Sequence, residues 1–232
     1  MTLRKIRMKL ITLTLLIILF TYSCVEENPE AKYHKGKIEY QITYLNKDFG
    51  DLSPAFLPQK MVLYFNKDYS VNIIEGFMGF FSLNNITYFN SSKCTTYLKV
   101  LDKNYVFKGK RNEQMCCFED MNNMEINQTN DTAVIAGIRC KKAIIKLPET
   151  NETFDIYYTD EIGLHDPNAT NPYGNIDGVL MDFHLQLSFL KMHFKAINFS
   201  NQKTGEKDFS IPKDSREIDR DAMSYVLQRL LD

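Results

Sequence analysis

Residues 37–44 read KIEYQITY, and this stretch decides the fold class. Its apolar residues Ile38, Tyr40, Ile42 and Tyr44 alternate with polar ones. Because successive side chains of a strand point to opposite faces, a period of two predicts a strand with one buried face.

The same alternation returns along the chain, with turn residues between the runs. The later runs that predict strands are 60–66, 69–74, 95–102, 104–109, 133–137, 140–148, 153–162, 178–187 and 191–199. About ten strands in succession predict a mainly β fold, built as a large antiparallel sheet or an open barrel.

One helix is expected, near the C-terminus. Residues 214–231 begin with Asp214 and Glu217 at capping-box spacing. The apolar residues that share one side of this predicted helix are Ile218, Met223, Val226, Leu227 and Leu230. We therefore expect the helix to lie against the sheet or to plug its concave side.

The N-terminus predicts export. A basic head precedes the apolar run 10–20, which is shorter than the roughly 20 residues that span a bilayer. Residues 21–24 resemble a bacterial lipobox, in which Cys24 becomes the acylated first residue. A plain signal peptide with an incidental cysteine is the alternative. We expect a lipoprotein signal peptide at 1–23, a tether at 24–35 and one β-rich domain at 36–232.

Val25-Glu26-Glu27 resembles the acidic export signal of Bacteroidota surface lipoproteins. We therefore expect a protein anchored to outer-membrane lipid through acylated Cys24, on the periplasmic face or the cell surface.

The charge balance argues against a nucleic-acid partner. Without residues 1–23, the chain has 24 basic and 29 acidic residues, a net charge of −5. A nucleic-acid binder would show basic patches, and attachment to anionic lipid would also need positive charge.

Residues 75–84 break the alternation, because Phe77, Phe80 and Phe81 lie around two glycines. Such a loop could enter a lipid layer or line an apolar cavity; the alternative is a turn or strand pair that closes the core. Residues 48–58 could form a second flap over the same opening.

Three motifs carry a resemblance to uncharacterised Bacteroidota lipoprotein families, the Gly-Leu-Pro-Gly-Leu-Ile and DUF4412-type domains. The matching residues are Gly137, Cys140, Lys141, Lys142 and Ala143, then Tyr157, Tyr158, Thr159 and Glu161, then Gly178 to Met181. The resemblance implies a fold similar to the Lol lipoprotein carriers: an open half-barrel with a helical lid over an apolar cavity. It implies binding of a lipid or another hydrophobic ligand and brings no catalytic residues.

Alternation on the long strands, together with this resemblance, predicts which residues line the cavity. The expected lining is Ile38, Tyr40, Ile42, Val179, Met181 and Phe183, with Phe77, Phe80 and Phe81 near the mouth. A filled core is the physical competitor, because protein interiors pack closely.

Four cysteines follow Cys24, an even number that suggests disulfides outside the cytoplasm. These disulfide candidates are Cys94, Cys116, Cys117 and Cys140. The alternative is that one or two remain reduced and buried. Residues 131–133 resemble a Bacteroidota O-glycosylation site, which makes Thr132 a candidate.

The histidines and motifs do not predict catalysis. His184 and His193 should share the polar face of two strands, where a joint metal site is the less favoured interpretation. The chain has no hydrolase, nucleotide-binding or zinc-protease motif. We therefore expect no enzyme and no cofactor. The two functions that remain are a hydrophobic-ligand carrier and a non-enzymatic interaction or structural subunit of an outer-membrane complex.

The lipid anchor can be tested directly. Cys24→Ser removes the thiol that acylation requires, so the variant should accumulate as a precursor or a soluble secreted form. Membrane fractionation measures this. A variant that still sediments fully with the outer membrane would contradict the lipobox interpretation.

Overall fold

The computed structural model describes residues 31–46, 49, 53–110, 121, 123–187, 189–201 and 211–231. All of them belong to one compact unit, Ala31–Asp232. The expected signal peptide and Cys24 lie outside the described residues. Among the described residues, no helix is long and apolar enough to cross a bilayer.

The described part of the chain is mainly β and forms one open, twelve-stranded sheet. Its order is β12-β6-β5-β4-β3-β2-β1-β11-β10-β9-β8-β7, and each neighbouring pair is antiparallel except β12 with β6. The strands are β1 (Gly36–Tyr44), β2 (Lys60–Phe65), β3 (Tyr69–Glu75), β4 (Phe81–Tyr88), β5 (Lys93–Val100), β6 (Lys103–Lys110), β7 (Glu125–Ile135), β8 (Ile138–Leu147), β9 (Glu152–Thr159), β10 (Val179–Leu187), β11 (Leu190–Ser200) and β12 (Arg216–Glu217). The prediction of a mainly β, largely antiparallel fold with a C-terminal helix is confirmed.

Most neighbouring strands are joined by short turns. The turn between β7 and β8 shows how the backbone conformation of a turn selects its residues. β7 and β8 are connected by Ala136 and Gly137, whose φ angles are 50° and 80°. A tight hairpin turn with both central residues at positive φ matches the twist of its strands, and glycine adopts that conformation without strain.

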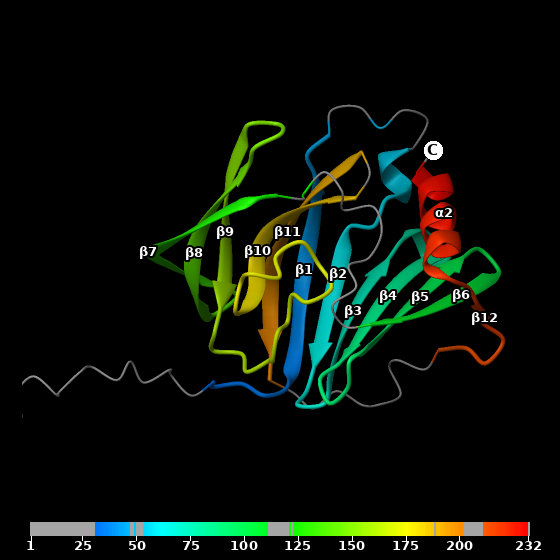
Figure 1. Cartoon of the computed structure of the whole chain (residues 1–232), viewed down its shortest axis with the longest axis horizontal. Helices are drawn as coiled ribbons and strands as arrows, with labels where there is room; N and C mark the ends of the chain where they lie inside the picture. Colours follow the sequence, from blue (N-terminus) through cyan, green and yellow to red (C-terminus); the bar gives the residue numbers. More distant parts are fainter. Residues whose placement is uncertain are drawn as a thin grey trace, which may run out of the picture. The chain divides into compact units, whose positions relative to one another are not determined.

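One face of the sheet, called here the covered face, carries Ile38 of β1 and Leu63 of β2, which are register partners. The register continues this face across β3, β4 and β5, where Ile74, Leu83 and Leu98 follow one another. Two segments cover it (Figure 1): the connection 160–178 between β9 and β10, drawn yellow, and helix α2 (Arg220–Leu231), drawn red.

The connection 160–178 fills the space over the middle of the sheet. Four of its apolar side chains are at most 8% exposed and pack in the same cluster as Ile38: Ile162, Leu164, Tyr173 and Ile176. Tyr33, in the expected tether, forms a bridge to Ile162. Asn168 fixes the far end of the connection, since its Nδ2 donates to the carbonyls of Ile176 and Gly178, both at 2.8 Å.

Helix α2 covers the β4–β6 end of the same face. Met223 and Leu227 are 3% exposed and pack against Leu83 and Leu98. The side predicted to be apolar is therefore the side that is buried.

The predicted start of the helix was wrong. Asp214 and Glu217 do not form its cap; Asp219 accepts from the backbone N–H of Ala222 at 2.8 Å, and the helix begins at Arg220. Glu217 instead lies in β12, and the next backbone N–H, that of Ile218, donates to Val106 of β6. Pairing with a sheet edge satisfies these backbone groups without a helical turn.

Packing of α2 predicts a difference between its two sides. Leu227→Ala should lower the free energy of unfolding by about 2–4 kcal/mol, because it leaves a cavity against Leu83 and Leu98. Tyr225→Ala, at a residue 62% exposed, should change it by less than about 0.5 kcal/mol. Urea unfolding measures both, and equal losses would show that α2 does not pack as described.

Candidate binding groove

The covered face keeps an open groove beside the connection 160–178. Its volume is about 100 Å³. The described residues that line it are Met61, Asn72, Ile74, Leu83, Asn85, Thr170, Asn171, Phe183, Leu185, Leu187, Met192 and Phe194. Because ligand sites commonly measure about 300–1,000 Å³, this groove fits a short apolar segment rather than a whole long chain.

Strand register builds the floor of the groove from apolar side chains. Ile74 of β3 lies between its partners Met61 and Leu83. On the other side, Phe183 of β10 is paired with Phe194 of β11, and their rings stack with centroids 5.1 Å apart. These contacts hold the floor in one arrangement.

Four residues of the lining are polar: Asn72, Asn85, Thr170 and Asn171. Asn72 and Asn85 are register partners on β3 and β4, on the covered face. Asn85 donates from Nδ2 to Thr170 Oγ1 at 3.3 Å, which joins the sheet to the connection 160–178. Asn171 accepts at Oδ1 from the backbone N–H of Tyr173 at 2.8 Å. The groove thus has amide and hydroxyl groups along one edge and an apolar floor.

A smaller cavity of about 40 Å³ adjoins the groove beneath the connection. It shares Met61, Asn72, Asn171 and Phe183 with the groove. Asn72 and Asn171 therefore lie where the two spaces meet.

The six strand residues expected to line a cavity are all buried in the core, and half of them border a cavity. Ile38, Tyr40, Ile42, Val179, Met181 and Phe183 are each at most 5% exposed and belong to one cluster. Of these six, Phe183 lines the groove, and Tyr40, Val179 and Phe183 line the smaller cavity.

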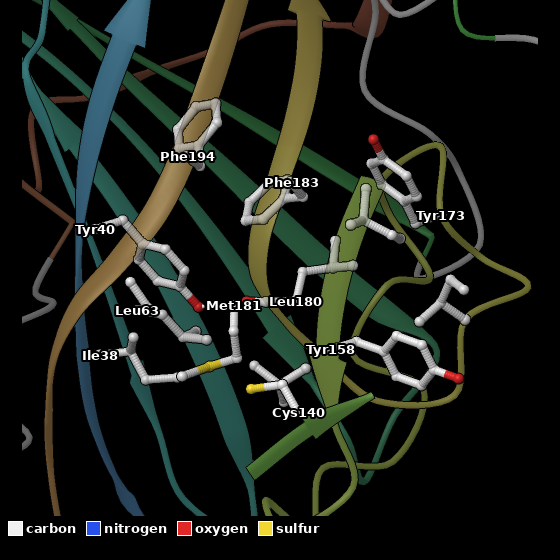
Figure 2. Packing of buried hydrophobic residues seen from close by; sticks show 14 of the residues in the cluster. Ile38, Tyr40, Leu63, Cys140, Tyr158, Tyr173, Leu180, Met181, Phe183 and Phe194 are labelled. Carbon is white, nitrogen blue, oxygen red and sulfur yellow. Dashed lines mark hydrogen bonds between the residues drawn. The ribbon is translucent and has the colours of Figure 1, made fainter. Parts of the chain in front are cut away.

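Tyr40 fills part of the space in which the sequence predicted a ligand cavity. Its hydroxyl donates to the Leu180 carbonyl at 2.8 Å, and Figure 2 shows the ring of Tyr40 reaching from β1 toward β10 beside Met181. Burial raises the pKa of the Tyr40 hydroxyl above its usual value. The tyrosine is a neutral core residue with a satisfied hydrogen bond.

The three phenylalanines expected at the mouth differ from one another. Phe77 belongs to a short turn, η2 (Phe77–Gly79), and its side chain is outside the described residues. Phe80 is 51% exposed. Phe81 opens β4 and packs with the α2 cluster. The segment thus connects β3 to β4, and its side chains range from exposed to partly buried.

A polar cluster lies on the opposite face, as the sequence predicted for the two histidines. His184 and His193 are register partners, with ring centroids 4.9 Å apart. His193 Nε2 lies 2.5 Å from Asp182 Oδ1, and Lys195 Nζ lies 3.1 Å from Asp182 Oδ2. Burial lowers the pKa of His184, and His193 lowers it further. No three His, Cys, Asp or Glu side chains among the described residues are placed to hold a metal ion.

The other candidates lie apart from the groove. Cys140 carries a free, buried thiol. Burial raises the pKa of this thiol to about 12. Cys94 is buried on β5. Cys116 and Cys117 lie outside the described residues. Thr132 is exposed on β7, next to a register shift.

Sequence reasoning missed the polar residues of the groove. Asn85 shares its strand face with Phe81 and Leu83, where the period of two favours an apolar residue, which is a signal that could have been read. Asn72 alternates with Val71 and Ile73, so the local period assigned it to the polar side. Thr170 and Asn171 come from a connection without periodicity, so nothing local marked them. No family model matches the chain, and no curated protein matches it.

The two adjacent phenylalanines allow a matched test. Phe81→Asp places a charge against the α2 cluster and should lower the free energy of unfolding by at least about 2 kcal/mol. Phe80→Asp, at an exposed side chain, should change it by less than about 0.5 kcal/mol. Thermal and urea unfolding measure both. A large loss in Phe80→Asp would mean that this side chain is also part of the core.

Proposed function

We propose that this protein is an outer-membrane-anchored lipoprotein that holds the apolar part of a lipid or another hydrophobic ligand in the groove. The lipobox-like segment at Cys24 supports the anchor, and the resemblance to carrier-like lipoprotein families supports the ligand class. The observation that carries the proposal is the apolar floor of the groove, which the residues that the structure describes leave open beside the connection 160–178.

The size of the groove sets what it would hold. An apolar cavity of about 150 Å³ binds a molecule as large as benzene, and the groove is of the same order. It would take the end of an acyl chain or a comparable apolar group, with the rest of the ligand remaining outside. In this scheme the residues Ile38 and Met181 support the floor from the core and do not contact the ligand.

The alternative is a non-enzymatic interaction or structural subunit of an outer-membrane complex. One observation favours it: Met78 and Leu101 are 80% and 61% exposed and lie in adjacent strand connections. The backbone N–H of Leu101 donates to the carbonyl of Phe80 at 2.7 Å, which holds these two connections side by side. Exposed apolar residues that cluster at one end of a sheet fit a partner surface.

A charge in the groove separates the two functions. Ile74→Glu places a carboxylate on the apolar floor, so lipid that co-purifies with the protein should fall at least about tenfold. Ile197→Glu is the matched control, because Ile197 is 51% exposed on β11 and does not line the groove. Native mass spectrometry of the purified protein measures the bound lipid.

Stability has to be followed in the same variants, since Ile74 also packs against the core. Leu185→Gln, a milder change of the same lining, serves as the second groove variant. Folded groove variants that keep all their lipid, or wild-type protein that carries none and binds no added acyl compound, would overturn the binding function and leave the interaction role.

A further inference from the structure

We propose that the groove selects uncharged amphiphiles, in which a short apolar chain carries an amide or hydroxyl group, and that Asn72 binds this polar group. The inference rests on the proposed function and names its ligand class.

The first reason is the charge of the lining. None of the described residues that line the groove is acidic or basic; its polar members are three asparagines and one threonine. The charged groups of β10 and β11, such as Asp182 and Lys195, pair with each other on the opposite face. A carboxylate or phosphate in the groove would lose water without gaining a cation, which costs free energy.

The second reason is the state of the amide groups. Asn171 and Asn85 are already engaged, with Tyr173 and Thr170 respectively. The half-buried Asn72 makes no side-chain hydrogen bond with any other residue that the structure describes. An amide offers both a hydrogen-bond donor and an acceptor. The amide of Asn72 therefore matches a ligand group that both accepts and donates hydrogen bonds.

The third reason is position. Asn72 lies where the groove meets the smaller cavity, next to the apolar floor formed by Met61 and Phe183. A ligand chain lying along the floor would therefore bring its polar group to Asn72. This places the apolar and polar parts of one small molecule against matching surfaces.

The test uses two ligands that differ only in the polar group. Octanamide is neutral and octanoate is ionised near neutral pH, and both carry the same chain. Titration calorimetry with the soluble secreted form of the Cys24→Ser variant, which lacks the proposed acyl anchor, should show octanamide binding at least about tenfold more tightly. Equal affinities would overturn the inference while the proposed function stands.

Asn72→Leu keeps the approximate size of the side chain and removes its hydrogen-bonding groups. It should lower the affinity for octanamide about tenfold and abolish the difference between the ligands. Asn127→Leu, on the exposed edge strand β7, is the control and should change neither affinity. Asn72→Ser replaces the leucine variant if that one fails to fold, and should weaken octanamide binding in the same direction.

Three results separate the outcomes. Selectivity that persists in the Asn72 variant would overturn the role of this residue. Tighter binding of octanoate would overturn the assignment of an uncharged ligand. Binding of neither compound to the wild type, together with absence of co-purified lipid, would overturn the proposed function and the inference together.

Discussion

The rest of the structure depends on the need to cover one wide apolar face of an open sheet. Leu63, Ile74, Leu83 and Leu98 follow one another across neighbouring strands on that face. The sheet order runs from β12 to β7 without closing on itself, so the strands cannot shield this surface alone. Apolar area left in water is costly in proportion to its size, and segments outside the sheet have to remove it.

Two segments do so, and they act by different means. Helix α2 contributes one apolar side, with Met223 and Leu227 as its most buried residues. The connection 160–178 has no regular secondary structure of its own, so its backbone groups need other partners. Asn168 provides hydrogen-bond partners for some of these backbone groups. Tyr173 joins the connection to β10, since its hydroxyl donates to the carbonyl of His184 at 2.5 Å. The buried Tyr173 and Ile176 then fill the space above β1 and β10.

The groove lies on the same covered face, beside the connection 160–178 and the side chains of Leu83 and Leu187 on which α2 packs. Its floor is apolar, while Asn72 and Asn85 face the same space. One of these asparagines also explains a missed element. Asn85 is polar at a position where the period of two favours an apolar residue, and it is one of the residues that hid strand β4 (Phe81–Tyr88) from sequence reasoning. Features that disturb the pattern of a fold often belong to its site.

The sequence by itself determined the local features. Alternation predicted ten of the strands and placed His184 and His193 on the polar side of theirs. The helical period predicted which side of the C-terminal helix is apolar. These features depend on neighbours in the chain, since side-chain direction repeats with a fixed period. Only the tertiary structure decided that Ile38 and Met181 are core, that β12 takes residues expected in the helix, and that the groove lies beside Asn72. The reason is that covering a sheet face depends on contacts between segments far apart in the chain, which no local period encodes.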